Sequence, residues 1–71
     1  MEAMIKITKL LGNQTEAAKQ LGELQQTVHK WCSGTQRIPA EKVLKLCIAV
    51  DYAVMPYELR PDLYKSTWIY Q

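Results

Sequence analysis

The stretch of sequence that decides the fold is QTEAAKQLGELQQTVHKWCS, residues 14–33. Apolar residues recur in it at helical spacing in two short runs, which Gly22 separates. Gly22 permits the positive φ of a tight turn, and the small side chain of Ala18 lets two helices cross closely. Val28 and Trp31 are spaced to anchor the second run to a core. The pattern Ala-x3-Gly-x5-Val-x2-Trp therefore predicts a helix-turn-helix, in which the second helix enters the major groove of DNA.

Helical periodicity and end signals outside this stretch complete an all-α chain with no strand. The five expected helices cover residues 2–11, 13–21, 25–33, 40–50 and 56–60. Glycines follow the first three, and prolines flank the last two, as is typical of residues that start or stop helices. Asn13 is a good N-cap for the second helix, whereas Leu24 gives the third helix no side-chain cap.

Four of these helices carry an apolar face that we expect to be buried. The faces consist of Met4, Ile7, Leu10 and Leu11 on the first, Ala17, Ala18 and Leu21 on the second, Leu24, Val28, Trp31 and Cys32 on the third, and Val43, Leu44, Cys47 and Ile48 on the fourth. The two cysteines are expected to be reduced, buried thiols, because a disulfide framework would need more of them.

The composition fits one small globular domain. The chain has 71 residues, 48% of them apolar, and a formal charge of +2. This balance is only mildly basic, so charge alone does not indicate a nucleic-acid partner. No apolar run approaches the roughly 20 residues of a membrane span, and no signal peptide is visible. We expect a helix-turn-helix domain over residues 1–64, a tail over 65–71, and a location in the cytoplasm of a bacterial host cell, associated with the nucleoid.

The exposed side of the second and third helices offers the groups that DNA recognition uses. Glutamine pairs with adenine in a bidentate manner, and lysine donates to guanine. Helix N-termini and small hydroxyl side chains contact phosphates. The expected DNA-binding residues are Gln14, Thr15, Gln25, Gln26, Thr27, His29, Lys30, Ser33 and Arg37. Lys42 and Lys45 are expected to add electrostatic attraction.

These segments resemble a known family. Residues 14–22 followed by 25–28 are similar to the helix-turn-helix of lambdoid phage repressors and Cro proteins. Trp31-x-Ser33-Gly34, residues 37–41 and residues 57–64 resemble more narrowly the YdaS/Cro-like prophage regulators. The resemblance covers about residues 12–64. It implies a five-helix, lambda-repressor-like helix-turn-helix domain, operator binding, transcriptional repression and often a dimer, and some relatives are described as antitoxins.

Two positions depart from that pattern. Relatives place an apolar residue and then a polar N-cap after the turn glycine, whereas Glu23 and Leu24 stand here in the opposite order. Leu24 is expected to reach the core through a slightly altered turn, and Glu23 to repel nearby phosphates. Asp51 and Tyr52 stand where relatives tend to carry glycines.

One copy of so small a module would make few contacts with an operator, so we expect a symmetric homodimer, at least on DNA. The candidate interface consists of Tyr57, Leu63, Trp68, Ile69 and Tyr70. The alternative is that these side chains fold back over the core of their own monomer.

The main functional alternative is an antitoxin or anti-regulator that acts by binding another protein. Catalysis is not expected, because His29 has no carboxylate near it in sequence and no catalytic motif appears. His29 and Cys32 could share a metal, but further ligands at suitable spacing are missing. We therefore expect no metal and no small-molecule cofactor.

Overall fold

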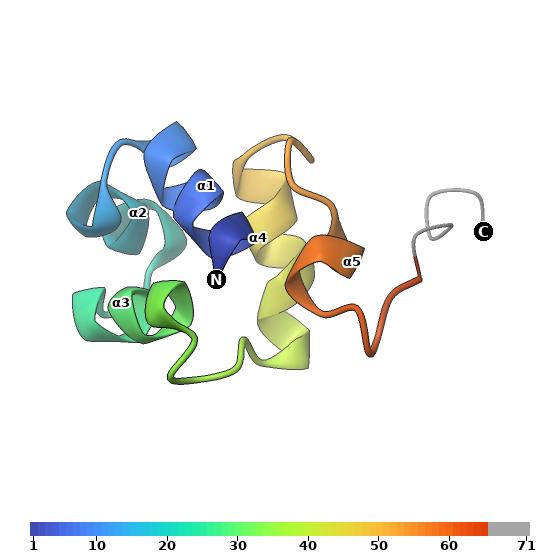
Figure 1. Ribbon diagram of the computed structural model, residues 1–71. Helices are drawn as coiled ribbons and strands as arrows, with labels where there is room; N and C mark the ends of the chain where they lie inside the picture. The colour runs from blue at the N-terminus through green and yellow to red at the C-terminus, as the bar shows by residue number, and fades with distance from the viewer. Residues whose placement is uncertain (66–71) are drawn as a thin grey trace.

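The computed structural model describes residues 1–65, which form five α-helices and one short 3₁₀-helix (Figure 1). The elements are α1 (Glu2–Leu11), α2 (Gln14–Leu21), α3 (Gln25–Ser33), η1 (Ala40–Lys42), α4 (Val43–Ala49) and α5 (Pro56–Leu59). No strand occurs within these residues. The all-α, five-helix, helix-turn-helix prediction is confirmed, with one difference: the expected fourth helix opens with the separate 3₁₀ segment η1.

The helices pack in two groups around α1. Helices α1, α2 and α3 contact one another pairwise, whereas α4 contacts α2 and α5, and α5 also contacts α1. Figure 1 shows α2 and α3 together at one end of the molecule and α5 at the other. The helix-turn-helix therefore lies at one end of the domain, where α1 packs against both of its helices and α4 packs against α2.

The buried residues predicted for the helix-turn-helix form the centre of the core. Ala18, Val28 and Trp31 are buried, and Leu21 joins them from the end of α2. Aromatic side chains bury 150–250 Å² each in folded proteins, about the largest area of any residue, so Trp31 is the main anchor of α3.

Backbone geometry at the turn matches the sequence signals. Oδ1 of Asn13 accepts a hydrogen bond of 2.8 Å from the backbone N–H of Glu16, which caps α2. Gly22 adopts φ 67°, in the left-handed region. The N–H groups of Gly22 and Glu23 donate to Lys19 and Ala18, the Schellman arrangement that ends a helix. Helix α3 begins after Leu24 without a side-chain cap, as predicted.

Several expected core positions are wrong. Leu24 is 68% exposed and Ile48 is 64% exposed, and Leu10 and Leu44 are exposed as well. Leu24 precedes α3 with extended backbone, φ −74° and ψ 144°, so the helical spacing used to place it does not apply.

On α4, apolar residues surround most of the helix, and spacing alone cannot choose the buried side. Val43, Leu46 and Cys47 are inside, rather than Leu44 and Ile48. On α1, Thr8 is buried and Leu10 is exposed, and the Thr8 hydroxyl is satisfied inside the core by donating to the carbonyl of Ile5 over 2.8 Å.

Candidate nucleic-acid interface

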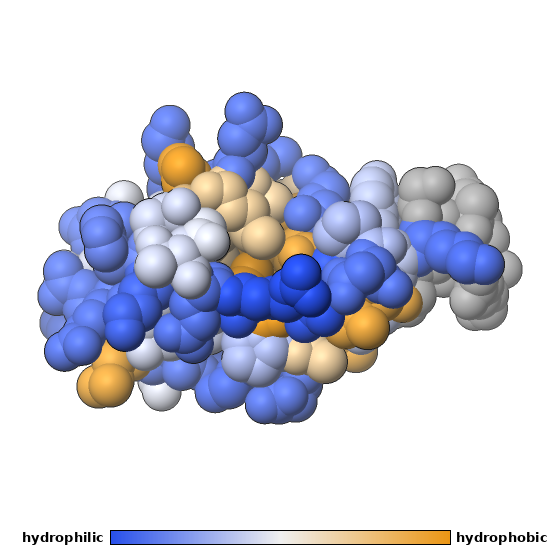
Figure 2. Space-filling model, turned by 60° about the horizontal axis from the view of Figure 1, so that its bottom comes forward, coloured by the Kyte–Doolittle hydropathy of each residue, from blue (hydrophilic) through white to orange (hydrophobic). Residues whose placement is uncertain are grey.

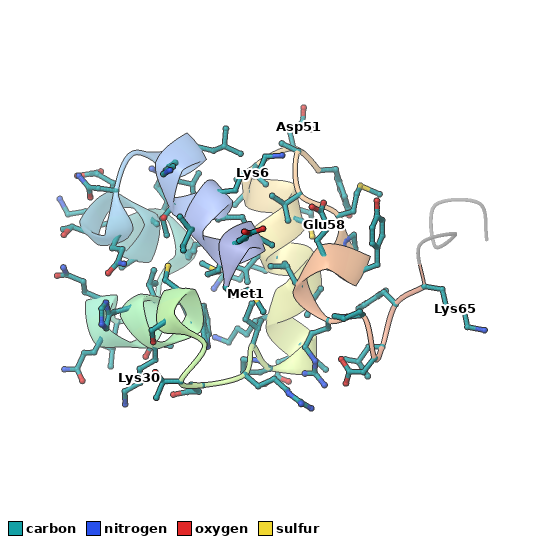
Figure 3. The ribbon with its side chains drawn as sticks, in the orientation of Figure 1. Met1, Lys6, Lys30, Asp51, Glu58 and Lys65 are labelled. Carbon is teal, nitrogen blue, oxygen red and sulfur yellow. The ribbon has the colours of Figure 1, made fainter. Side chains whose placement is uncertain are left out.

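Helix α3 has two chemically distinct faces. Val28, Trp31 and Cys32 are buried against the core. The opposite face consists of the exposed residues Gln25, Gln26, His29, Lys30 and Ser33, with Thr27 half-buried at its edge. The five exposed residues are therefore available to a partner, as base recognition requires. Figure 3 shows Lys30 pointing away from the body of the molecule.

Gln14 joins this face from the first turn of α2. Its Oε1 lies 3.3 Å from Nδ1 of His29, a contact that fits donation by the Nδ1–H tautomer of the imidazole. The contact uses one of the two polar atoms of each side chain, and the second atom of each remains chemically able to bind elsewhere. Thr15, the next residue, is exposed beside it. The structure thus brings the predicted α2 and α3 residues onto one surface.

An open hollow of about 450 Å³ lies on this surface. Its lining is polar apart from one residue and consists of Gln14, Leu24, Gln25, Gln26 and His29. The hollow is at the N-terminal end of α3, where recognition helices make their base contacts. Sequence reasoning found four of its five residues but placed Leu24 in the core.

Ser33 ends α3 and Arg37 lies beyond it, and both are less free than predicted. The Ser33 hydroxyl donates to the carbonyl of Lys30 over 3.1 Å, and the Thr35 hydroxyl lies 2.6 Å from the Ser33 hydroxyl. Nη1 of Arg37 is 3.8 Å from a carboxylate oxygen of Asp62, yet its side chain is largely exposed. Arg37 therefore suits a phosphate contact better than Ser33 does.

A second arginine holds the loop that carries Arg37. Nη1 of Arg60 donates to the carbonyl of Ile38 over 2.8 Å, and its Nε and Nη2 donate to the two carboxylate oxygens of Asp62 at 2.9 and 2.7 Å. These bonds from Arg60 lower the pKa of Asp62 to about 2. The Leu59-Arg60-Pro61-Asp62 stretch thus links the segment after α5 to the segment after α3, a role that its sequence did not reveal.

Three charged side chains form what we call the Glu23 clamp: Glu23, Lys42 and Lys45. Both lysines contact Oε2 of Glu23, Lys45 over 3.4 Å. The hydrogen bond from Lys42 is the main reason that the pKa of Glu23 lies below its ordinary value. Glu23 is therefore neutralised by two cations, and the expected repulsion of phosphates is reduced. By the same contacts, Lys42 and Lys45 carry less uncompensated positive charge than predicted.

The remaining predictions concern the dimer and metal sites. Tyr57 is half-buried and Leu63 is exposed, whereas Trp68, Ile69 and Tyr70 lie outside the described residues. No group of three metal-ligating side chains occurs within residues 1–65. Over the same part of the chain, every helix is too short or too polar to cross a membrane.

Both cysteines are buried, free thiols. Burial raises the pKa of the Cys32 thiol and, with the nearby Glu58 carboxylate, raises the pKa of the Cys47 thiol to about 11.

Comparison with known proteins gives one finding. The model of the family described as bacterial toxin YdaS matches residues 4–68. Searches of curated proteins and of solved structures gave no significant match. The family match spans nearly all of the 71 residues and covers every helix described above except the first two residues of α1. The chain therefore belongs to the YdaS family.

Proposed function

We propose that this protein is a sequence-specific DNA-binding transcriptional regulator, a Cro-like prophage repressor that binds double-stranded operator DNA as a homodimer. The observation that carries the proposal is the division of α3 into a buried face and an exposed polar face. Val28 and Trp31 fix the helix to the core, and the residues that carry amide and amine groups on the other face are exposed. A rigid helix with such a face has the shape and chemistry that the major groove accepts.

Most residues of this surface have a defined role in the proposal. Gln25 and Gln26 pair with base edges, for which adenine is the best match, and Lys30 donates to a guanine or a phosphate. Gln14 orients His29 and lies with Thr15 at the N-terminus of α2, where backbone N–H groups favour a phosphate. Arg37 contacts a more distant phosphate. Affinity then comes mainly from phosphates, and specificity from α3.

A dimer would double the small contact area of one copy. Specific operators bury roughly 1,000–2,500 Å² of protein surface, which is large for a 71-residue chain. We expect half-sites about one helical turn, or 34–36 Å, apart. Tyr57 and Leu63 are the described candidates for the dimer contact.

The family supports a coarser statement, namely a small prophage-type regulatory or toxin–antitoxin protein. Two observations favour the second candidate, an antitoxin or anti-regulator that binds a protein. The matching family is described as a toxin, and the net charge of +2 is low for a DNA-binding domain whose lysines are in part neutralised by Glu23. Binding that survives high salt and needs a protein partner would favour this candidate, because phosphate contacts weaken steeply with salt.

The proposal is tested by selecting bound duplexes from random DNA with the full chain. We expect a pseudo-palindromic site, and Gln26→Ala should weaken binding to it by about 1–3 kcal/mol and relax preference at particular bases. Gln20→Ala is the matched control, because Gln20 hydrogen-bonds the Leu11 carbonyl and lies outside the hollow. Failure to enrich any sequence, or equal effects of Gln26→Ala on selected and random DNA, would overturn the proposal.

A further inference from the structure

Leu24 is in an environment that neither packing nor helix capping explains. Among residues 1–65 it is the most exposed of the large apolar side chains, at 68%. It also occupies the N-cap position of α3, where its side chain accepts no hydrogen bond. Serine, threonine, asparagine or aspartate would stabilise the helix there. Leu24 therefore stabilises α3 less than a capping residue would.

The neighbours of Leu24 are polar groups suited to bases. It lines the hollow with Gln14, Gln25, Gln26 and His29. Figure 2 shows a small apolar patch surrounded by hydrophilic side chains at the end of the molecule that carries α2 and α3. An apolar group at this position would meet the same major-groove edges as the glutamines beside it.

Among the four bases, only thymine presents an apolar group in the major groove, its C5-methyl. We propose that Leu24 contacts the C5-methyl group of one thymine in each half-site and thereby sets a preference for thymine at that position. This inference rests on the proposed DNA-binding function. It adds an apolar contact to the hydrogen bonds of Gln25 and Gln26, and it explains why a leucine stands at a cap position.

Uracil is the appropriate probe, because it differs from thymine in DNA only by that methyl group. In the selected site, each thymine of one half-site is replaced in turn by uracil, and the affinity of the full chain is measured by fluorescence anisotropy. Burial of one methyl group from water corresponds to about a fourfold change in binding. We expect one thymine at which uracil weakens wild-type binding by about fourfold, and no change at that position for Leu24→Ala.

Two further variants separate recognition from folding. Leu10→Ala removes another exposed leucine, from α1, and should keep the full sensitivity to uracil. Leu24→Ser supplies a cap for α3, so it should raise the melting temperature while it abolishes the sensitivity to uracil.

The outcomes distinguish the inference from the function on which it rests. If the wild-type chain binds its site but no uracil weakens it, the inference is wrong and the proposed function stands. The same holds if uracil weakens wild type and Leu24→Ala equally, because another residue then contacts the methyl group. If no DNA sequence is bound, the proposed function fails and the inference fails with it. A Leu24→Ala variant that loses only the binding of a protein partner would also overturn it.

Discussion

Glu23→Gln tests the electrostatic link between the turn and α4. The substitution keeps the size of the side chain but removes the charge that two lysines contact. Charge-assisted hydrogen bonds contribute about 1.5–3 kcal/mol when shielded, and exposed ion pairs about 0.2–1 kcal/mol. The side chain of Glu23 is 12% exposed, that of Lys42 32% and that of Lys45 45%. The contribution of the Lys42 contact therefore lies between these two energy ranges, and that of the Lys45 contact lies in the lower range. We therefore expect Glu23→Gln to lower the free energy of unfolding by about 1–2 kcal/mol. Each kcal/mol lowers the melting temperature of a domain of this size by roughly 4–8 °C.

Urea denaturation followed by circular dichroism measures this loss. Glu41→Gln is the matched control, because Glu41 is an exposed acid of η1 with no ion pair recorded within residues 1–65. The pKa of Glu23 is lowered from 4.5, so its contribution is present above pH 4.5 and is lost as the pH falls below that value. Wild type and Glu23→Gln should therefore converge in acid. A variant as stable as wild type at neutral pH, or a difference that persists in acid, would refute the reasoning.

Three other predictions concern single residues. Asp51 adopts φ 53°, a conformation that glycine adopts without strain. Asp51→Gly should therefore raise the free energy of unfolding, measured by urea denaturation, by up to about 1 kcal/mol, and a lower stability would contradict this. Asn13→Ala should cost about 1 kcal/mol, because it removes the cap of α2; an unchanged melting temperature would show that the 2.8 Å bond to Glu16 contributes nothing. Asp62 has its pKa lowered from 3.8 to about 2, so its stabilisation is present above pH 3.8 and is lost as the pH falls toward 2. Asp62→Asn should therefore lose less stability than wild type over that interval, and parallel pH profiles would contradict this.

The boundaries of the helix-turn-helix could be predicted from sequence because they depend on local chemistry. A cap at Asn13, a left-handed glycine at Gly22 and another at Gly34 each act within a few residues. The buried face of α3 followed from its 3.6-residue period, because its other face is strictly polar. The same argument failed on α4, where apolar residues surround the helix and only contacts with α2 and α5 select the buried side.

The contacts that shape the candidate interface could not be predicted, because they join residues far apart in sequence. Glu23 meets Lys42 and Lys45 across 19 and 22 positions, and Gln14 meets His29 across 15. No periodicity connects such pairs. The positive φ of Asp51 and Tyr52 gives a physical reason for the glycines that the family resemblance implies at these positions.

The central claim is that the polar face of α3 contacts base edges. NMR spectra of the side-chain amides, recorded on the full chain, test this claim most directly. The amide groups of Gln14, Gln25 and Gln26 are followed during titration with the selected duplex, with Gln20 as the internal reference. The account predicts that the first three signals shift while Gln20 does not, and that the shifts of Gln25 and Gln26 are lost on a duplex with a changed half-site. Shifts confined to α1 or α5, with the α3 glutamines unmoved, would contradict it.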